Sequence, residues 1–103
     1  IRDVADLYSL ALTKAPAGSF YFAENGENSM RQVCEAINAM MGVEVSPQSM
    51  SISDAAQEWG EGSSNHTMGS NSRVKAKRSR SELGWRPASM SLIEEIRSGC
   101  YAD

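Results

Sequence analysis

The sequence has few of the residues that carry chemistry in most enzymes. It contains one histidine, His66, which excludes a metal site built from several histidines. Its two cysteines, Cys34 and Cys100, lie far apart, each on an apolar helical stripe where cysteine usually acts as a small hydrophobic residue. We interpret both as reduced structural thiols, as in a cytoplasmic protein, and we predict no metal site.

Long apolar segments are also missing. No run approaches the length of a bilayer-spanning helix, and the start lacks the basic-then-apolar pattern of a signal peptide. We therefore expect no membrane partner. With 103 residues and 41% hydrophobic content, the sequence predicts one domain, residues 1–103, with a modest core.

A third absence concerns nucleotide binding. A Rossmann domain binds a dinucleotide through a glycine-rich turn between its first strand and helix, where backbone amides approach the pyrophosphate. The chain has no such turn, because Gly60 and Gly62 follow a helical pattern. We therefore predict no cofactor-binding residue in this chain.

What is present is an alternation of helices and short apolar segments. Capping boxes at Ser29 with Gln32 and at Ser91 with Glu94 predict two helix starts, and Asp3 and Ser53 are candidate caps for two more. The aromatic residues 19–23 and the alternating residues 43–45 predict short strands. We expect an α/β fold, a small α+β subdomain of about five helices with two or three short strands.

Residues 60–70 are rich in glycine and serine and poor in apolar side chains. Such a composition predicts a flexible loop. Loops of this length usually have a function or are disordered.

The last third carries the most specific pattern. Leu83 closes an apolar stripe, Gly84 supplies the left-handed residue that ends a helix, and Pro87 prevents the helix from resuming, so that Trp85 packs under the turn. This order, followed by the capped helix at Ser91, resembles the C-terminal part of the NAD-dependent epimerase/dehydratase family, the extended or atypical short-chain dehydrogenases/reductases. The start of the chain, with its Asp-Val-Ala at residues 3–5, resembles the junction that follows the Rossmann part of that family.

The resemblance implies a substrate-binding subdomain whose N-terminal Rossmann domain is absent from this chain. The parent enzyme would use NAD or NADP for epimerisation, dehydration or carbonyl reduction. The family's acid/base pair is a Tyr with a Lys four residues later, and Tyr8, Tyr21 and Tyr101 have no Lys at that offset. We therefore predict no catalytic residue here and a fragment that is inactive alone, while an independent small domain stays the alternative.

By the same resemblance, loops of this subdomain contact a small-molecule substrate, and we predict Asn71, Ser72 and Arg73 as its binding residues. The alternative is that the first two only satisfy turn amides and that Arg73 is exposed. Nucleotide-sugar epimerases of the family often carry an Arg-x-Gly-Asp element in this region. Residues 66–71 contain no arginine, so a smaller carbonyl or alcohol substrate is as plausible as a nucleotide sugar.

Basic residues concentrate in residues 73–86 although the net charge is -3. This segment suggests a second hypothesis, a small anion-binding, nucleic-acid-binding or protein-interaction module. No aromatic residue interleaves with the basic run to stack on bases, so nucleic acid is the weaker of these partners.

The fragment hypothesis also predicts an exposed interdomain surface. We expect apolar residues of the first helix and of Phe20, Tyr21 and Phe22 to contribute to it, so that the chain alone self-associates or is marginally stable.

Overall fold

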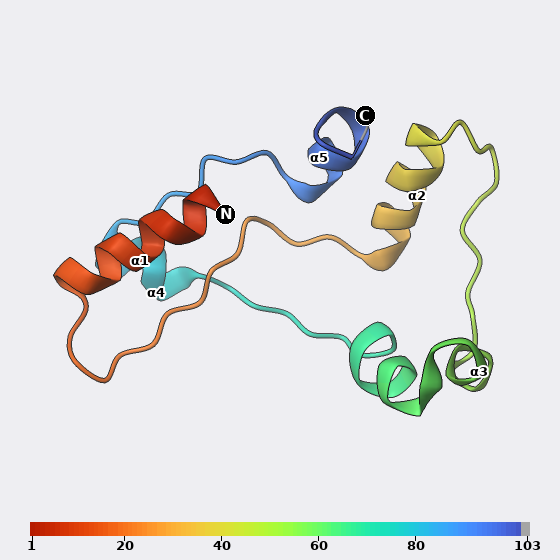
Figure 1. Ribbon diagram of the computed structural model, residues 1–103, viewed down its shortest axis with the longest axis horizontal. Helices are drawn as coiled ribbons and strands as arrows, with labels where there is room; N and C mark the ends of the chain where they lie inside the picture. The colour runs from red at the N-terminus through yellow and green to blue at the C-terminus, as the bar shows by residue number, and fades with distance from the viewer. Residues whose placement is uncertain (102–103) are drawn as a thin grey trace.

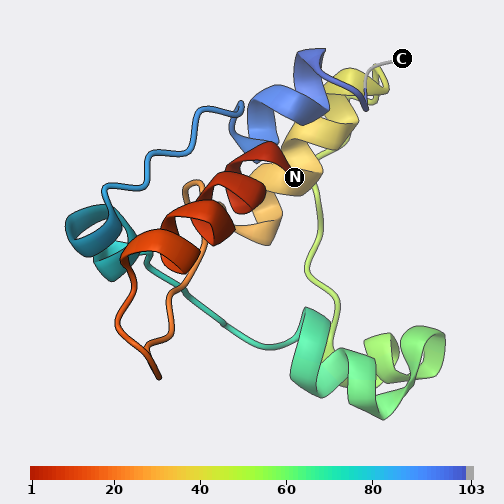
Figure 2. The same cartoon turned by 60° about the vertical axis from the view of Figure 1, so that its left-hand side comes forward.

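The computed structural model describes residues 1–101, and these residues form helices joined by irregular segments. The elements pack in pairs, α1 with α4, α2 with α5, and α3 with the π-helical segment η1 (Figures 1 and 2). In chain order they are α1 (Arg2–Lys14), α2 (Met30–Met40), α3 (Ile52–Gly62), η1 (Ser63–Met68), α4 (Lys77–Leu83) and α5 (Leu92–Ser98).

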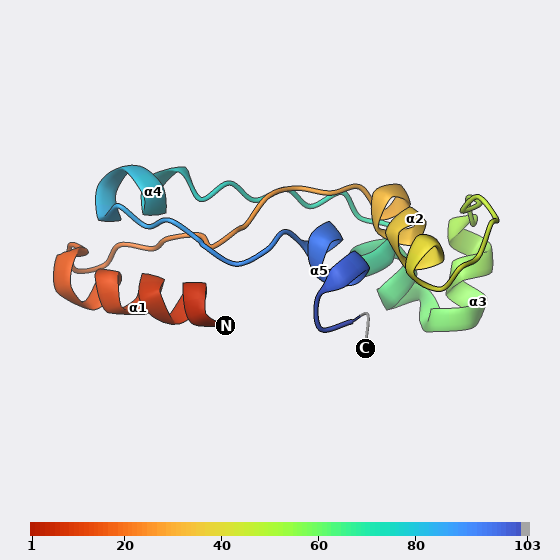
Figure 3. The ribbon, with the colours of Figure 1, turned by 90° about the horizontal axis from the view of Figure 1, so that it is seen from above.

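The three pairs stand apart at the ends of long linkers, so the molecule is open and flat (Figures 1 and 3). Its radius of gyration is 17.3 Å and its extents are 47 × 32 × 19 Å. A compact domain of this length has a radius of gyration of about 13 Å. The chain therefore leaves much apolar surface uncovered, including Leu12 and Tyr8, which are 87% and 70% exposed.

The main core lies between α1 and α4, where buried side chains of both helices and of the following turn meet. Its buried members are Leu7, Ala76, Leu83 and Trp85, with Tyr21 and Leu10 packed against them. Smaller contacts hold the other pairs, with Ala36 of α2 and Ile96 of α5 both buried. Each pair thus buries a few side chains instead of sharing one interior.

Trp85 joins the start of α1 to the turn that follows α4. Its side chain is 2% exposed, and its indole Nε1 donates a hydrogen bond of 2.7 Å to the Asp3 carbonyl oxygen. The Asp3 carboxylate accepts from the backbone amides of Ala88 and Ser89 at 2.9 and 3.0 Å, which lowers its pKa. Asp3 is therefore not the helix cap that the sequence suggested, because α1 begins at Arg2 and this carboxylate holds the turn after Trp85.

The predicted α/β class is wrong for the described residues, which contain five α-helices and no strand. Residues 19–23 alternate as a strand would, with Tyr21 facing the core and Phe20 and Phe22 exposed. A strand needs a neighbouring strand to take its backbone hydrogen bonds. Here α4 takes two of them with side chains instead: Arg78 donates to the Phe20 carbonyl oxygen at 3.3 Å, and the Ser79 hydroxyl donates to that of Phe22.

The second predicted strand, residues 43–45, is likewise irregular in the structure. It follows α2 at the opposite end of the molecule from residues 19–23 (Figure 1). The two apolar segments therefore cannot pair with each other.

Several of the predicted helix boundaries are confirmed by the structure. Both capping boxes are present, at Ser29 with Gln32 and at Ser91 with Glu94. Gly84 ends α4 in the left-handed conformation, with φ of 71°. The cap of α3 is Ser51 instead of Ser53, since the Ser51 hydroxyl accepts from the Asp54 amide at 3.1 Å.

The segment predicted as a loop, residues 60–70, is mostly helical. Gly60 has a φ of 79° and kinks the chain, as a helix stop would, but helical structure resumes at Glu61 and continues through η1. The buried Ser64 donates from its hydroxyl to the Glu61 carbonyl oxygen at 3.2 Å. Short polar side chains thus close helical turns locally, while the flexibility of this segment stays a prediction.

Glu24 fixes residues 19–28 against the start of α4. Its side chain is 12% exposed, forms an ion pair with Arg80, and accepts from the backbone amides of Gly26 at 2.8 Å and Ala76 at 3.2 Å. Ala76 precedes α4 and offers no side-chain cap, so this distant carboxylate serves the positive end of the helix. The hydrogen bond from Arg80, then those from the two amides, lower the Glu24 pKa from 4.5 to about 2.

None of the helices in residues 1–101 combines the length and the apolar character that crossing a bilayer requires.

We expect Trp85→Phe to lower the free energy of unfolding by about 1–3 kcal/mol, because the variant loses the hydrogen bond to Asp3 and part of a buried ring. Urea unfolding followed by circular dichroism at 222 nm measures the change. Trp59→Phe is the matched control, since Trp59 is 50% exposed, and it should change stability by less than about 0.5 kcal/mol. Equal effects of the two substitutions would contradict this account of the core.

Glu24→Gln should destabilise the chain by about 1–3 kcal/mol at pH 7, because an amide replaces a carboxylate that takes charge-assisted hydrogen bonds. The pKa of this carboxyl is depressed on folding, so its contribution is complete above pH 4.5 and is lost as the pH falls toward 2. Urea unfolding at a series of pH values should show the difference between wild type and variant shrinking over that range. Glu44→Gln, at an exposed acid after α2, serves as control, and a difference independent of pH would refute the assignment.

Candidate functional site

A cleft of about 680 Å³ opens between the start of α2 and the segment that follows η1. Its volume lies in the range of small-molecule sites. Polar side chains with two methionines among them form its walls. They are Glu27, Asn28, Ser29, Met30, Gln32, Thr67, Met68, Gly69, Ser70, Asn71, Ser72 and Arg73.

All three predicted substrate-binding residues, Asn71, Ser72 and Arg73, line this cleft and are exposed to solvent. No side-chain hydrogen bond engages Asn71 or Ser72 within residues 1–101, so the suggestion that they satisfy turn amides has no support in this arrangement. Their amide and hydroxyl groups are open to a ligand. Substrate binding by these residues stays a prediction.

The wall after η1 is held by a tight turn. The Ser70 hydroxyl donates to the Thr67 carbonyl oxygen at 3.1 Å, and Gly69 lies directly against the Ser64 carbonyl. A side chain at Gly69 would collide with that backbone oxygen, so the close approach requires glycine. Residues 70–73, which follow this contact, line the cleft opposite the start of α2.

The opposite wall is the capped start of α2. The backbone amide of Gln32 donates to the Ser29 hydroxyl at 3.2 Å, and the backbone amide of Ser29 donates to Gln32 Oε1 at 2.8 Å. The capping box therefore uses both side chains, and it leaves the half-buried Asn28 without a side-chain partner in residues 1–101.

The charges at the rim offset one another only in part, because one carboxylate faces two cations. Glu27 forms ion pairs with Arg73 at 3.3 Å and with Lys75 at 3.0 Å. The hydrogen bond from Lys75, followed by the charge of Arg73, lowers the Glu27 pKa, so this carboxylate is ionised at neutral pH. Arg73 and Glu27 are the charged residues among those that line the cleft, and they face each other.

Sequence reasoning found one wall of this cleft and missed the other. The sequence pattern indicates Gln32 only as part of a capping box, and it gives no role to Glu27 and Asn28, which line the same wall. The available signal was the polar loop directly before a capped helix, since such loops place several side chains at one helix end. What the pattern could not show is which distant segment faces that end.

The six cations of the basic segment, residues 73–86, are offset in part by three carboxylates of this same chain. Four of its cations are paired: Arg73 and Lys75 with Glu27, Arg78 with Glu82 at 2.8 Å, and Arg80 with Glu24. The pair with Arg78 lowers the Glu82 pKa. In residues 1–101, Lys77 and Arg86 are the cations of this segment without an ion pair.

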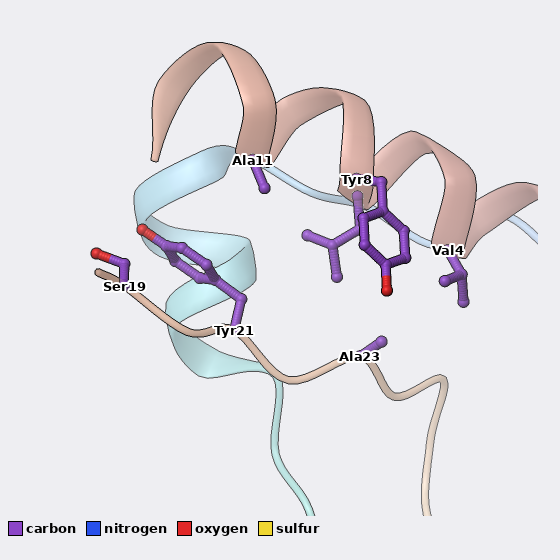
Figure 4. Close-up of a pocket in the computed structure, with 7 residues that line it drawn as sticks. Val4, Tyr8, Ala11, Ser19, Tyr21 and Ala23 are labelled. Carbon is purple, nitrogen blue, oxygen red and sulfur yellow. The ribbon is translucent and has the colours of Figure 1, made fainter. Parts of the chain in front are cut away.

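A second, smaller hollow of about 260 Å³ lies between α1 and residues 19–23. Figure 4 shows Val4, Tyr8 and Ala11 of the helix facing Tyr21 and Ala23 of the opposite segment. This apolar groove shares no residue with the polar cleft, so the molecule has two separate surfaces of contrasting chemistry.

Catalytic machinery is not apparent at either surface. No group of three or more His, Cys, Asp or Glu residues suited to a metal ion occurs in the described part of the chain. His66 lies on η1 and is exposed. The lining residues of the polar cleft offer amide and hydroxyl groups for hydrogen bonds to a ligand.

Comparison with protein-family models, with curated proteins and with solved structures finds no match for this chain.

Proposed function

We propose that this chain is the substrate-binding subdomain of an NAD(P)-dependent epimerase/dehydratase or carbonyl reductase of the extended or atypical short-chain dehydrogenase/reductase type. The observation that carries the proposal is that the segment Asn71, Ser72 and Arg73 lines a cleft of suitable size. The turn through Gly84 and Trp85 carries the resemblance. It adds support because Trp85 is a buried member of the main core between α1 and α4. The chain holds a substrate, and the nicotinamide chemistry belongs to a Rossmann domain of the parent enzyme.

The proposal implies that the Rossmann domain of the parent enzyme docks on this chain, and the apolar groove between α1 and residues 19–23 is a suitable surface for it. The carbonyls of Phe20 and Phe22 are taken by α4, and successive residues of an extended segment point their backbone groups to opposite sides. The backbone groups of Tyr21 therefore face away from α4, and they make no hydrogen bond within residues 1–101. An open backbone edge beside an apolar groove suits a domain that adds a strand and covers α1.

The open shape is explained by the same partner. Helix pairs that bury so little of their apolar surface need a common body to pack on. In this proposal the Rossmann domain is that body, and the cytoplasm is its compartment, where Cys34 is kept as a half-buried thiol.

The alternative of an anion-binding module is disfavoured by the ion pairs. A phosphate would have to compete with Glu24, Glu27 and Glu82 for the guanidinium and ammonium groups of the basic segment. Lys77 and Arg86 alone make a weak electrostatic footprint for nucleic acid.

The cofactor arm of the proposal is tested by fluorescence titration with NADH and NADPH. The chain alone should bind neither, whereas the parent enzyme that this proposal implies, the complete protein, should bind at least one of them. Asn71→Ala in the complete protein should raise KM about fivefold or more and leave cofactor affinity unchanged, because a lost hydrogen bond costs about 1 kcal/mol. Asn65→Ala, outside the cleft, is the control, and failure of the complete protein to bind either nicotinamide would overturn the proposal.

The docking arm predicts that the isolated chain self-associates through α1 and residues 19–23. Tyr8→Lys should weaken this association at least tenfold, because it places a charge in the groove. Sedimentation equilibrium measures the association, with Trp59→Lys on α3 as the matched control. A chain that stays monomeric at high concentration, or equal effects of both substitutions, would contradict this use of the groove.

A further inference from the structure

Helix α3 has an apolar stripe that the rest of residues 1–101 covers only in part. Ile52, Ala56 and Trp59 follow one another at a spacing of four and then three residues, so they share one face of the helix. The side chains of Ile52 and Trp59 are each about half exposed. Helix α3 packs against η1 and against no other helix in the described part of the chain. A continuous apolar stripe on an open helix face is typical of a surface that a partner covers.

This stripe is separate from the apolar groove and from the polar cleft. None of Ile52, Ala56 and Trp59 lines either of them. Helix α3 lies at the opposite end of the molecule from α1, which forms one side of the groove (Figures 1 and 3). A domain that docks on the groove therefore approaches the other end of the chain.

The charge around the stripe is of one sign. Between Arg31 and Arg73 the chain contains five acids and no lysine or arginine. Three of these acids belong to α3: Asp54 and Glu58 lie one turn apart, and Glu61 follows the kink at Gly60. No ion pair engages any of the three within residues 1–101. A partner for this surface is therefore selected for positive charge.

We infer that this face of α3 is a docking site for a basic amphipathic helix of a partner protein. The backbone groups of an α-helix are bonded to one another, so α3 offers side chains and no open edge to which a strand could add. A partner helix can lay its own apolar stripe on Ile52, Ala56 and Trp59, with its lysines and arginines beside the carboxylates of α3. The indole of Trp59 suits both contacts, since it is a frequent anchor of interfaces and a favourable face for a cation.

Other occupants fit this surface less well. A second copy of the chain would offer α4 as its basic helix, but the exposed side chains of α4 are all charged or polar, whereas Leu83 is buried. It therefore lacks an apolar stripe to place on Trp59. An anionic membrane would be repelled by the carboxylates of α3.

The test is a titration of a dye-labelled peptide with the 103-residue chain, followed by fluorescence anisotropy. The probe is a synthetic helix of leucine and lysine with the leucines on one face, and its matched control has glutamate in place of every lysine. The lysine peptide should bind saturably and at least tenfold more tightly than the glutamate peptide. Raising the salt concentration from about 0.05 M to about 0.5 M should weaken the binding several-fold, because exposed charges are screened.

Variants locate the bound peptide. Trp59→Lys should weaken binding of the lysine peptide at least tenfold, because it removes the anchor and adds a like charge. Glu58→Gln combined with Glu61→Gln should weaken it about fivefold through the loss of two exposed charges, and this variant keeps the test decisive if Trp59→Lys fails to fold. Tyr8→Lys and Asp6→Asn on α1 are the matched controls and should leave binding unchanged.

Four outcomes would overturn the inference. Equal losses in Trp59→Lys and Tyr8→Lys would place the peptide elsewhere, and equal affinity for the two peptides would remove the role of charge. The third is the absence of saturable binding. The fourth is that Trp59→Lys abolishes self-association of the chain, which would make a second copy the occupant. Because none of these outcomes involves nicotinamide binding or the polar cleft, the inference stands or falls independently of the proposed function.

Discussion

The placement of Trp85 is the constraint on which the rest of this structure depends. Gly84 turns the chain out of α4 in a left-handed conformation, and the indole that follows it enters the space beside Leu7 and bonds to the Asp3 carbonyl. The Asp3 carboxylate then holds the chain after Pro87. One turn thus joins the first helix to the last third of the sequence. Because α4 is fixed by this contact, Arg78, Ser79 and Arg80 can in turn fix residues 20–24 and so set the direction in which the chain leaves toward α2.

Local signals predicted the parts of the fold whose physics is local. The capping boxes at Ser29 and Ser91 and the stop at Gly84 are decided by a few neighbouring residues, and the structure confirms them. The strand prediction for residues 19–23 is wrong for a different reason. Alternation shows which side chains face the core, and Tyr21 does face it. A β-strand, however, also needs a neighbouring strand to form its backbone hydrogen bonds, and residues 19–23 have none. The helical turns in η1 were missed because Gly- and Ser-rich composition carries no apolar periodicity.

The candidate site likewise has one wall that could be predicted from the sequence and one that depends on contacts between distant segments. Asn71, Ser72 and Arg73 are predicted by resemblance, and in the structure this one segment lines the polar cleft. Glu27, Asn28 and Gln32 on the facing wall could not be predicted, because forty or so residues separate the two segments and no pattern in either names the other. The ion pairs of Glu27 show the same difficulty for charge. A run of six cations looks like an anion-binding surface in sequence, whereas in space Glu24, Glu27 and Glu82 offset half of that charge.

The ion pairs of the basic segment connect the apolar groove with the polar cleft. The acids that pair with the basic segment hold residues 19–28 between α4 and the start of α2, with the apolar groove at one end and the polar cleft at the other. A body that docked on the groove would press on Tyr21, whose hydroxyl donates to Glu82 at 3.0 Å, and Glu82 in turn holds Arg78. From there the backbone runs directly to Glu24 and Glu27. Covering the apolar groove would therefore stiffen the linker that carries one wall of the cleft. Under the proposed function, a Rossmann domain docked on the groove would in this way also order the proposed substrate site.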